Sequence, residues 1–180
     1  MSIKRFEIDG YGQLELNAAP FRRSGRIEAQ CKIADGIDYL ENGMLLAVDY
    51  NTRTVGYATG AEGEVIGLNY TTEHMYDERE QGLKHFKLDK DTFLPRIGFV
   101  SVADKFTTNC LAYDDAEYTD EDAVKEAVAA VSKETPVYGK ACENGAIQIT
   151  ATAEGAHVRV IKPFTMPDGQ YAVQFTGLKN

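Results

Sequence analysis

The sequence predicts a mainly β fold, a small β-barrel or β-sandwich, with one amphipathic helix over about residues 120–134. Three observations support this prediction. Short segments rich in β-branched and aromatic residues recur along the chain, glycine-containing turns separate them, and only one stretch has a helical pattern. Short strands with such breaks are typical of a sandwich or barrel. We expect one β-rich domain over residues 26–180, preceded by an extended N-terminal arm over residues 1–25.

The strands are predicted where apolar residues alternate or form short runs. The turns between them include Glu41-Asn42-Gly43, residues 60–63, residues 143–145 and Pro167-Asp168-Gly169. The expected strands are residues 13–16, 27–33, 44–49, 54–57, 65–70, 96–102, 106–113, 137–142, 147–150, 157–162 and 171–176. The last two are expected to form a hairpin with a longer loop over residues 163–170.

The helix prediction depends on a start signal, an apolar stripe and a stop signal. Thr119 can cap the first turn, and Asp122 follows three residues later, as in a capping box. The apolar stripe consists of Val124, Ala127, Val128 and Val131. Pro136 ends the pattern, because proline has no N–H to donate and restricts the residue before it. We therefore expect one helix to pack on a sheet through small side chains.

The first 25 residues show little periodicity and, together with Arg26 directly after them, hold the candidate partner-binding residues. Arginine forks can form paired hydrogen bonds with carboxylates of a partner, and apolar side chains can anchor the segment beside them. The candidates are Ile3, Phe6, Phe21, Arg22, Arg23 and Arg26. The alternative is that this segment is an edge strand and a loop of the same domain.

Charge limits the classes of partner. The chain has a net charge of −9, although residues 1–32 carry six basic and four acidic side chains. An acidic body repels a phosphate backbone, so we expect no direct binding to nucleic acid. A mildly basic start can dock on an acidic partner, unless the difference is only a local fluctuation in composition.

The cysteines and the apolar segments limit the compartment. Cys31, Cys110 and Cys142 are an odd number with no Cys-x-x-Cys pair, which fits a reducing cytoplasm. No apolar run approaches the roughly 20 residues of a membrane span, and residues 1–10 contain no secretory signal. We therefore expect no membrane association.

Two clusters of acidic and histidine residues resemble metal ligands in type. The first is Glu73-His74-x-x-Asp77-Glu78 with His85, and the second is the acidic run over residues 114–122. Neither has zinc-enzyme or EF-hand spacing, so we predict no metal and no cofactor. We expect residues 70–90 to be a packed functional loop or a short helix.

The catalytic motifs that we searched for are incomplete. The glycine pair in residues 60–63 is not followed by the Gly-Lys-Ser/Thr of a phosphate-binding loop, and no Gly-x-Ser-x-Gly occurs. Cys110 lies in a predicted apolar strand, where a buried thiol is usual. The sequence therefore favours a protein that is not an enzyme.

Six segments are informative when taken together, namely residues 11–17, 25–31, 41–49, 69–79, 92–101 and 166–170. With these segments the chain resembles small virion structural proteins of tailed phages and prophages of Gram-positive bacteria. The genes of that group sit in the head module near the major capsid protein. Residues 42–49, followed by short strands, are also similar in style to small β-barrel head-decoration proteins.

The resemblance implies a structural role in the virion and no catalytic residue. The expected partners are the major capsid protein and further copies of this chain on the shell. The protein would be made in the host cytoplasm and end in the capsid, where it decorates or stabilises the head. The alternatives are a head–tail connector, tail or fibre-base subunit, or, in another class, a small-molecule-binding β-barrel or enzyme.

Overall fold

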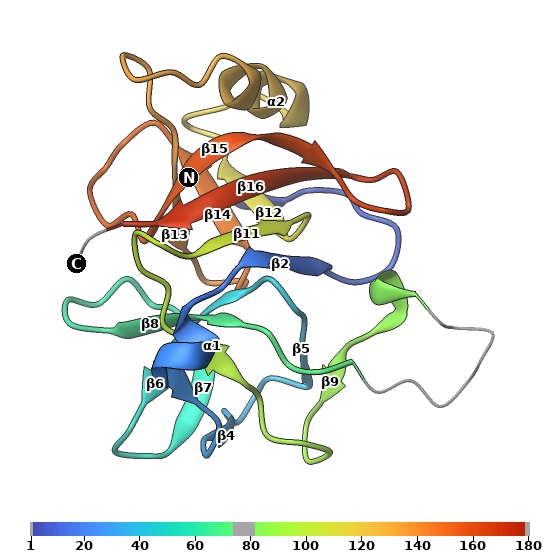
Figure 1. The fold of residues 1–180 in the computed structure, drawn as a ribbon, viewed down its shortest axis with the longest axis vertical. Coiled ribbons are helices and arrows are strands. Elements are labelled where there is room, and N and C mark those ends of the chain that lie inside the picture. Colours follow the sequence, from blue (N-terminus) through green and yellow to red (C-terminus); the bar gives the residue numbers. More distant parts are fainter. Residues whose placement is uncertain (1, 74–81, 179–180) are drawn as a thin grey trace.

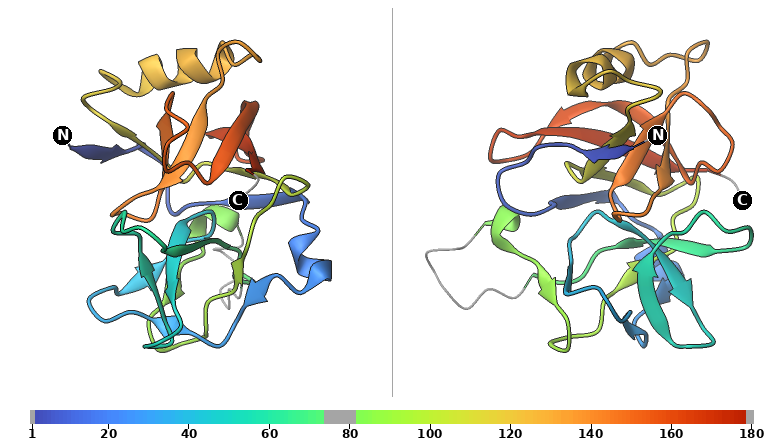
Figure 2. Two further views of the ribbon diagram at one scale, coloured as in Figure 1. Left: turned by 90° about the vertical axis from the view of Figure 1, so that its left-hand side faces the viewer. Right: turned by 180° about the vertical axis from the view of Figure 1, so that it is seen from behind.

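The computed structural model describes residues 2–73 and 82–178 and has the mainly β fold that the sequence predicts (Figure 1). In Figure 1 an eight-stranded sheet curls under the helix α2 (Glu121–Ala129), and a six-stranded sheet lies below it. A short helix, α1 (Phe21–Ser24), lies at the front of the lower sheet. Figure 2 shows the same two layers from the side and from behind.

The eight-stranded sheet has the order β1-β12-β14-β13-β15-β16-β11-β2. Its strands are β1 (Ile3–Arg5), β2 (Leu14–Ala18), β11 (Lys105–Thr108), β12 (Leu111–Asp114), β13 (Tyr138–Ala141), β14 (Ile147–Thr150), β15 (Val158–Thr165) and β16 (Tyr171–Gly177). All neighbours are antiparallel except β12 and β14, which are parallel. The curled sheet resembles half of a barrel.

The six-stranded sheet has the order β3-β10-β8-β6-β7-β4. Its strands are β3 (Ile27–Glu28), β4 (Lys32–Ile33), β6 (Leu45–Asp49), β7 (Thr54–Tyr57), β8 (Val65–Asn69) and β10 (Ile97–Gly98). A separate pair joins β5 (Tyr39–Leu40) to β9 (Leu88–Asp89), and a 3-10 turn, η2 (Leu83–His85), precedes β9.

Two hydrophobic clusters hold the layers together. The cluster under α2 contains Phe106 and Phe175 of the upper sheet together with Leu68 of the lower sheet. The second cluster contains Leu46 of the lower sheet together with Ala112 of the upper sheet. Since each cluster takes residues from both sheets, the two layers bury their apolar surface jointly.

The first 25 residues are part of the domain, which corrects the expected extended arm and the boundary at residue 26. Strand β1 pairs with β12, and β2 pairs with β11, so both are edge strands of the upper sheet. The side chains of Phe6 and Phe21 are 5% and 0% exposed. The alternative of an edge strand and loop is therefore the correct one. Such short strands show too few alternations to stand out in the sequence.

The main helix is present but shorter than expected, because it ends at Ala129 rather than near residue 134. Its cap is Asp120, whose side chain accepts a hydrogen bond from the Ala123 N–H, rather than Thr119. After the helix, the Ser132 hydroxyl accepts the N–H groups of residues 134 and 135. Serine side chains compete with helical hydrogen bonds in this way, which explains the early end.

The centres of the predicted strands agree with the structure better than their ends do. The segments 54–57 and 147–150 are strands with the predicted bounds. The segment 27–33 splits into β3 and β4, 106–113 splits into β11 and β12, and 96–102 is a strand only at β10. The expected final hairpin forms between β15 and β16, with Pro163 inside β15.

No helix in residues 2–73 or 82–178 has the length and apolar character that a membrane span requires.

Candidate functional site

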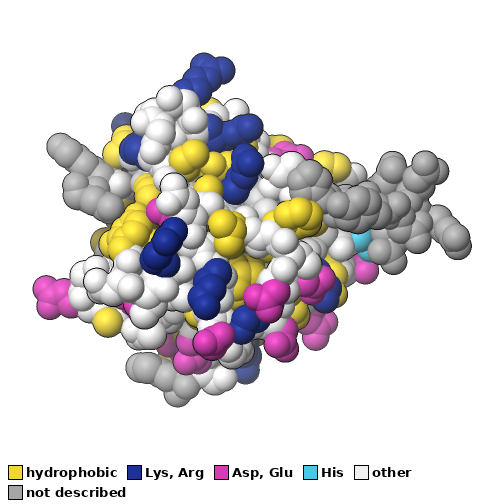
Figure 3. Space-filling view, turned by 90° about the horizontal axis from the view of Figure 1, so that it is seen from below, with side chains coloured by type: hydrophobic (Ala, Val, Ile, Leu, Met, Phe, Trp, Pro, Cys, Tyr) yellow, Lys and Arg dark blue, Asp and Glu magenta, His cyan; other side chains and the backbone are white. Residues whose placement is uncertain are grey.

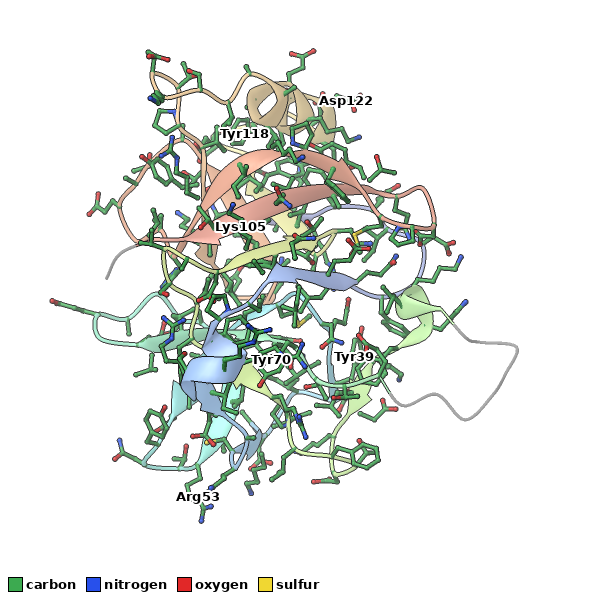
Figure 4. The ribbon with its side chains drawn as sticks, in the orientation of Figure 1. Tyr39, Arg53, Tyr70, Lys105, Tyr118 and Asp122 are labelled. Carbon is green, nitrogen blue, oxygen red and sulfur yellow. The ribbon has the colours of Figure 1, made fainter. Side chains whose placement is uncertain are left out.

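The best candidate for a docking surface is a group of arginines around α1, which we call the arginine face and define as Arg22, Arg23 and Arg96. The turn that presents the first two is firmly anchored. The Phe21 ring is buried and contacts the Tyr70 ring edge-on, with the centroids 5.2 Å apart. Gly25 ends the turn with φ of 73°, a conformation that glycine adopts readily. Figure 4 shows Tyr70 beside α1.

Arg26 supports α1 instead of facing a partner, contrary to its expected role. Its Nη2 lies 2.9 Å from Oδ2 of Asp104, a fully buried carboxylate. Asp104 also accepts hydrogen bonds from the Phe21 and Ser101 N–H groups. A buried carboxylate needs such donors, and Arg26 supplies the matching charge. The pair therefore fixes the position of α1.

The three residues of the arginine face are exposed, and their side chains form no hydrogen bond or ion pair with any other residue that the structure describes. Arg22 and Arg96 line one groove of about 290 Å³ together with Tyr70. Burial raises the pKa of Tyr70, and the nearby Arg96 and Arg22 guanidinium groups partly oppose that rise. Glu73 also lines the groove, so the two guanidinium groups are offset in part by one carboxylate.

Charge is unevenly distributed on the underside of the molecule. On the face seen from below, Lys and Arg side chains are prominent in the upper and central parts of the view, whereas most Asp and Glu side chains lie in its lower part, among further Lys and Arg side chains (Figure 3).

The remaining sequence candidates do not join the arginine face. Phe6 and Phe21 are core residues and cannot anchor a partner, while Ile3 is half-buried and lines a cleft elsewhere. Of the six candidates, only Arg22 and Arg23 remain exposed here. Arg96 was missed because it reaches the face only through the position of β10, which no local pattern reveals.

A second candidate site is a cleft of about 1090 Å³ between the two sheets. It is lined by residues 58–66, by residues 140–143 and by residues 154–157, with Gln148 and Phe99 among the other lining residues. The turn at residues 58–64 and the loop before β15 lie one above the other at the left in Figure 1, and Figure 2 shows them from behind.

His157 is one of the titratable groups that line this cleft. Its Nδ1 accepts a hydrogen bond from the Ala141 N–H at 3.4 Å, and its backbone N–H donates to the Gly139 carbonyl. Burial lowers the pKa of His157, with a partly opposing effect of Glu64. The imidazole is therefore neutral at pH 7.

An ion pair joins β1 of the upper sheet to the residue that follows β5. Both nitrogens of the Arg5 fork donate to the carboxylate of Glu41, which is 1% exposed. Cys110 lies 3.7 Å from the same guanidinium. Burial raises the pKa of Cys110 to about 12 and that of Cys142 to about 11. Thiols that stay protonated are poor nucleophiles, so neither cysteine is an activated nucleophile.

The two clusters considered as metal ligands differ in how much of each the structure describes. Most of the first, residues 74–78, lies outside the described residues, while Glu73 accepts a hydrogen bond from Asn42. In the second, Asp115 accepts the Ser2 N–H, and Glu117 accepts the Ala151 N–H. Among residues 2–73 and 82–178, no group of three or more His, Cys, Asp or Glu side chains is placed to hold a metal ion.

No protein-family model, curated protein or solved structure matches this chain.

Proposed function

We propose that this protein is a structural protein of a phage virion that binds the major capsid protein through the arginine face and decorates or stabilises the head. The main support for this docking surface is that its three arginines are exposed and form no ion pair with an acidic residue in the described part of the chain. The resemblance described above supplies the virion context.

The binding free energy of one copy is small, so this surface depends on many equivalent contacts on the shell. Each exposed ion pair contributes about 0–1 kcal/mol, so one copy gains little from the arginines alone. Exposed apolar residues can add burial to the interface, and Ile27 and Val102 are 41% and 59% exposed. On a shell, many equivalent contacts and contacts between neighbouring copies add to the binding of each copy.

The test is co-sedimentation with shells assembled from the major capsid protein of the same phage. We expect the full chain to bind and its binding to weaken as salt is raised. The variant Arg22→Glu/Arg23→Glu/Arg96→Glu is expected to lose at least about tenfold in affinity, since each charge reversal adds repulsion to the lost attraction. Lys32→Glu/Lys133→Glu/Lys162→Glu makes the same change in net charge elsewhere and should keep its affinity.

Equal binding of the two triple variants would contradict the assigned surface, and no binding by the full chain would contradict the function. Cryo-electron microscopy of the bound shells distinguishes the roles within a virion. Decoration predicts density over the whole shell, whereas a connector predicts a ring at one vertex.

A further inference from the structure

The cleft between the sheets has an open strand edge in one wall. Strand β10 pairs with β8 only at Leu68 and Asn69. Val65 and Ile66 continue β8 into the cleft and have no neighbouring strand on that side among the described residues. An open edge of this kind offers backbone N–H and C=O groups to an added extended chain.

The floor of the cleft holds a glutamine, Gln148, whose amide has no hydrogen-bond partner among the described residues. Gln148 is 3% exposed, and its side chain forms no hydrogen bond with any residue in 2–73 or 82–178. In the sheet it lies between Ala112 of β12 and Lys140 of β13, and both Gln148 and Lys140 line the cleft. The amide lines the cleft, and a Gln amide can both donate to a carbonyl and accept an N–H. A peptide group offers both.

The acidic side chains that line the cleft favour a ligand with positive charge. Four glutamates and one lysine line it, and the neutral His157 adds no positive charge. Glu64 is held by the Thr59 and Gly60 N–H groups. The exposed Glu62, Glu143 and Glu154 form no hydrogen bond or ion pair among the described residues, so their charges are free to meet a cation.

From these three features we propose that the cleft binds an extended peptide segment of a partner chain with alternating basic and apolar residues. Its backbone pairs with the open edge of β8 and with the Gln148 amide. Its apolar side chains contact the floor at Ile3 and Phe99, and its basic side chains face the glutamates. This surface is separate from the arginine face, and the inference does not rest on the proposed function.

The test is fluorescence anisotropy of a labelled octapeptide, acetyl-(Lys-Val)4-amide, titrated with the full chain. We expect saturable binding that Glu62→Gln/Glu143→Gln/Glu154→Gln weakens at least tenfold. The matched control Glu7→Gln/Asp38→Asn/Glu126→Gln removes the same charge from exposed sites elsewhere and is expected to bind as the unmodified protein does. Gln148→Met, which keeps the length of the side chain but loses the amide, should weaken binding severalfold. Circular dichroism checks that each variant is folded.

A second probe separates strand pairing from charge attraction. Acetyl-(Lys-Pro)4-amide has the same charge but lacks half of the N–H donors, so we expect it to bind at least severalfold more weakly. The proposal is overturned if the Lys-Val peptide does not bind. It is also overturned if the cleft and control triple variants weaken binding equally, or if the Lys-Pro peptide binds as well as the Lys-Val peptide.

Discussion

At the scale of single residues, burial decides which polar groups are available. Arg22 and Arg26 are only four positions apart. Arg26 forms an ion pair with the buried Asp104, whereas Arg22 is exposed. The sequence reveals the type of side chain but not its partner. The role of Arg22 and Arg23 in binding therefore stays a prediction, and the sequence could not show that Phe6 and Phe21 are core residues.

The half-buried His157 makes stability depend on pH. Because burial lowers its pKa in the folded state, the unfolded chain binds a proton more readily. Stability should therefore be fully present above the ordinary histidine pKa of about 6.5 and fall as the pH drops below it, by at most about 1.4 kcal/mol per pH unit. Urea unfolding between pH 7.5 and 5.5 measures this slope.

The control for this prediction compares two histidines. His157→Gln should flatten the pH dependence, whereas His85→Gln, at an exposed position, should leave it unchanged. An equal slope in the unmodified protein and in His157→Gln would show that other groups cause the dependence.

At the scale of elements, the ends depend on side chains that the periodicity does not report. The apolar stripe located α2 because Val124 and Val128 are both fully buried. Its length was overestimated because Ser132 and Thr135 form a competing turn. The two-residue strands β5 and β9 are defined by their pairing with each other, so no local pattern could have predicted them.

Asp120 is the residue on which the start of α2 depends. Its side chain accepts the Ala123 N–H at 2.9 Å, so Asp120→Ala leaves that donor without its partner. We expect a loss of about 0.5–2 kcal/mol in the free energy of unfolding. Asp120→Asn keeps an acceptor oxygen and should lose much less. Chemical denaturation measures both changes, and equal losses in the two variants would contradict a capping role.

At the scale of the whole molecule, neither the strand order nor the sites could be obtained from the sequence. The arrangement brings β1 beside β12 and places β14 parallel to β12, two long-range pairings without a local signal. The cleft combines side chains from at least four separate segments of the chain. Composition and turns predicted the fold class because strand-forming residues and turns recur along the whole chain. A site depends instead on contacts between strands that are distant in the sequence.

The N-terminal segment tests this long-range organisation directly. Deletion of residues 2–18 removes both edge strands of the upper sheet and the buried side chains of Phe6 and Leu14. It also removes Arg5 and leaves the carboxylate of Glu41 buried without its cation. Breaking a buried pair on one side alone costs roughly 3–5 kcal/mol, and a domain has only about 5–15 kcal/mol in total. We therefore expect the shortened chain not to fold.

Near-ultraviolet circular dichroism and thermal unfolding measure this outcome, with the full chain as the reference. The expected result is loss of the tertiary signal and of a cooperative transition, because the remaining strands β11 and β12 each lose a neighbour. A shortened chain that keeps both signals would restore the idea of a dispensable arm. Addition of a synthetic peptide of residues 1–18 offers a further check, since a segment that completes the sheet should recover the signal at high concentration, whereas a detached arm has no place to bind.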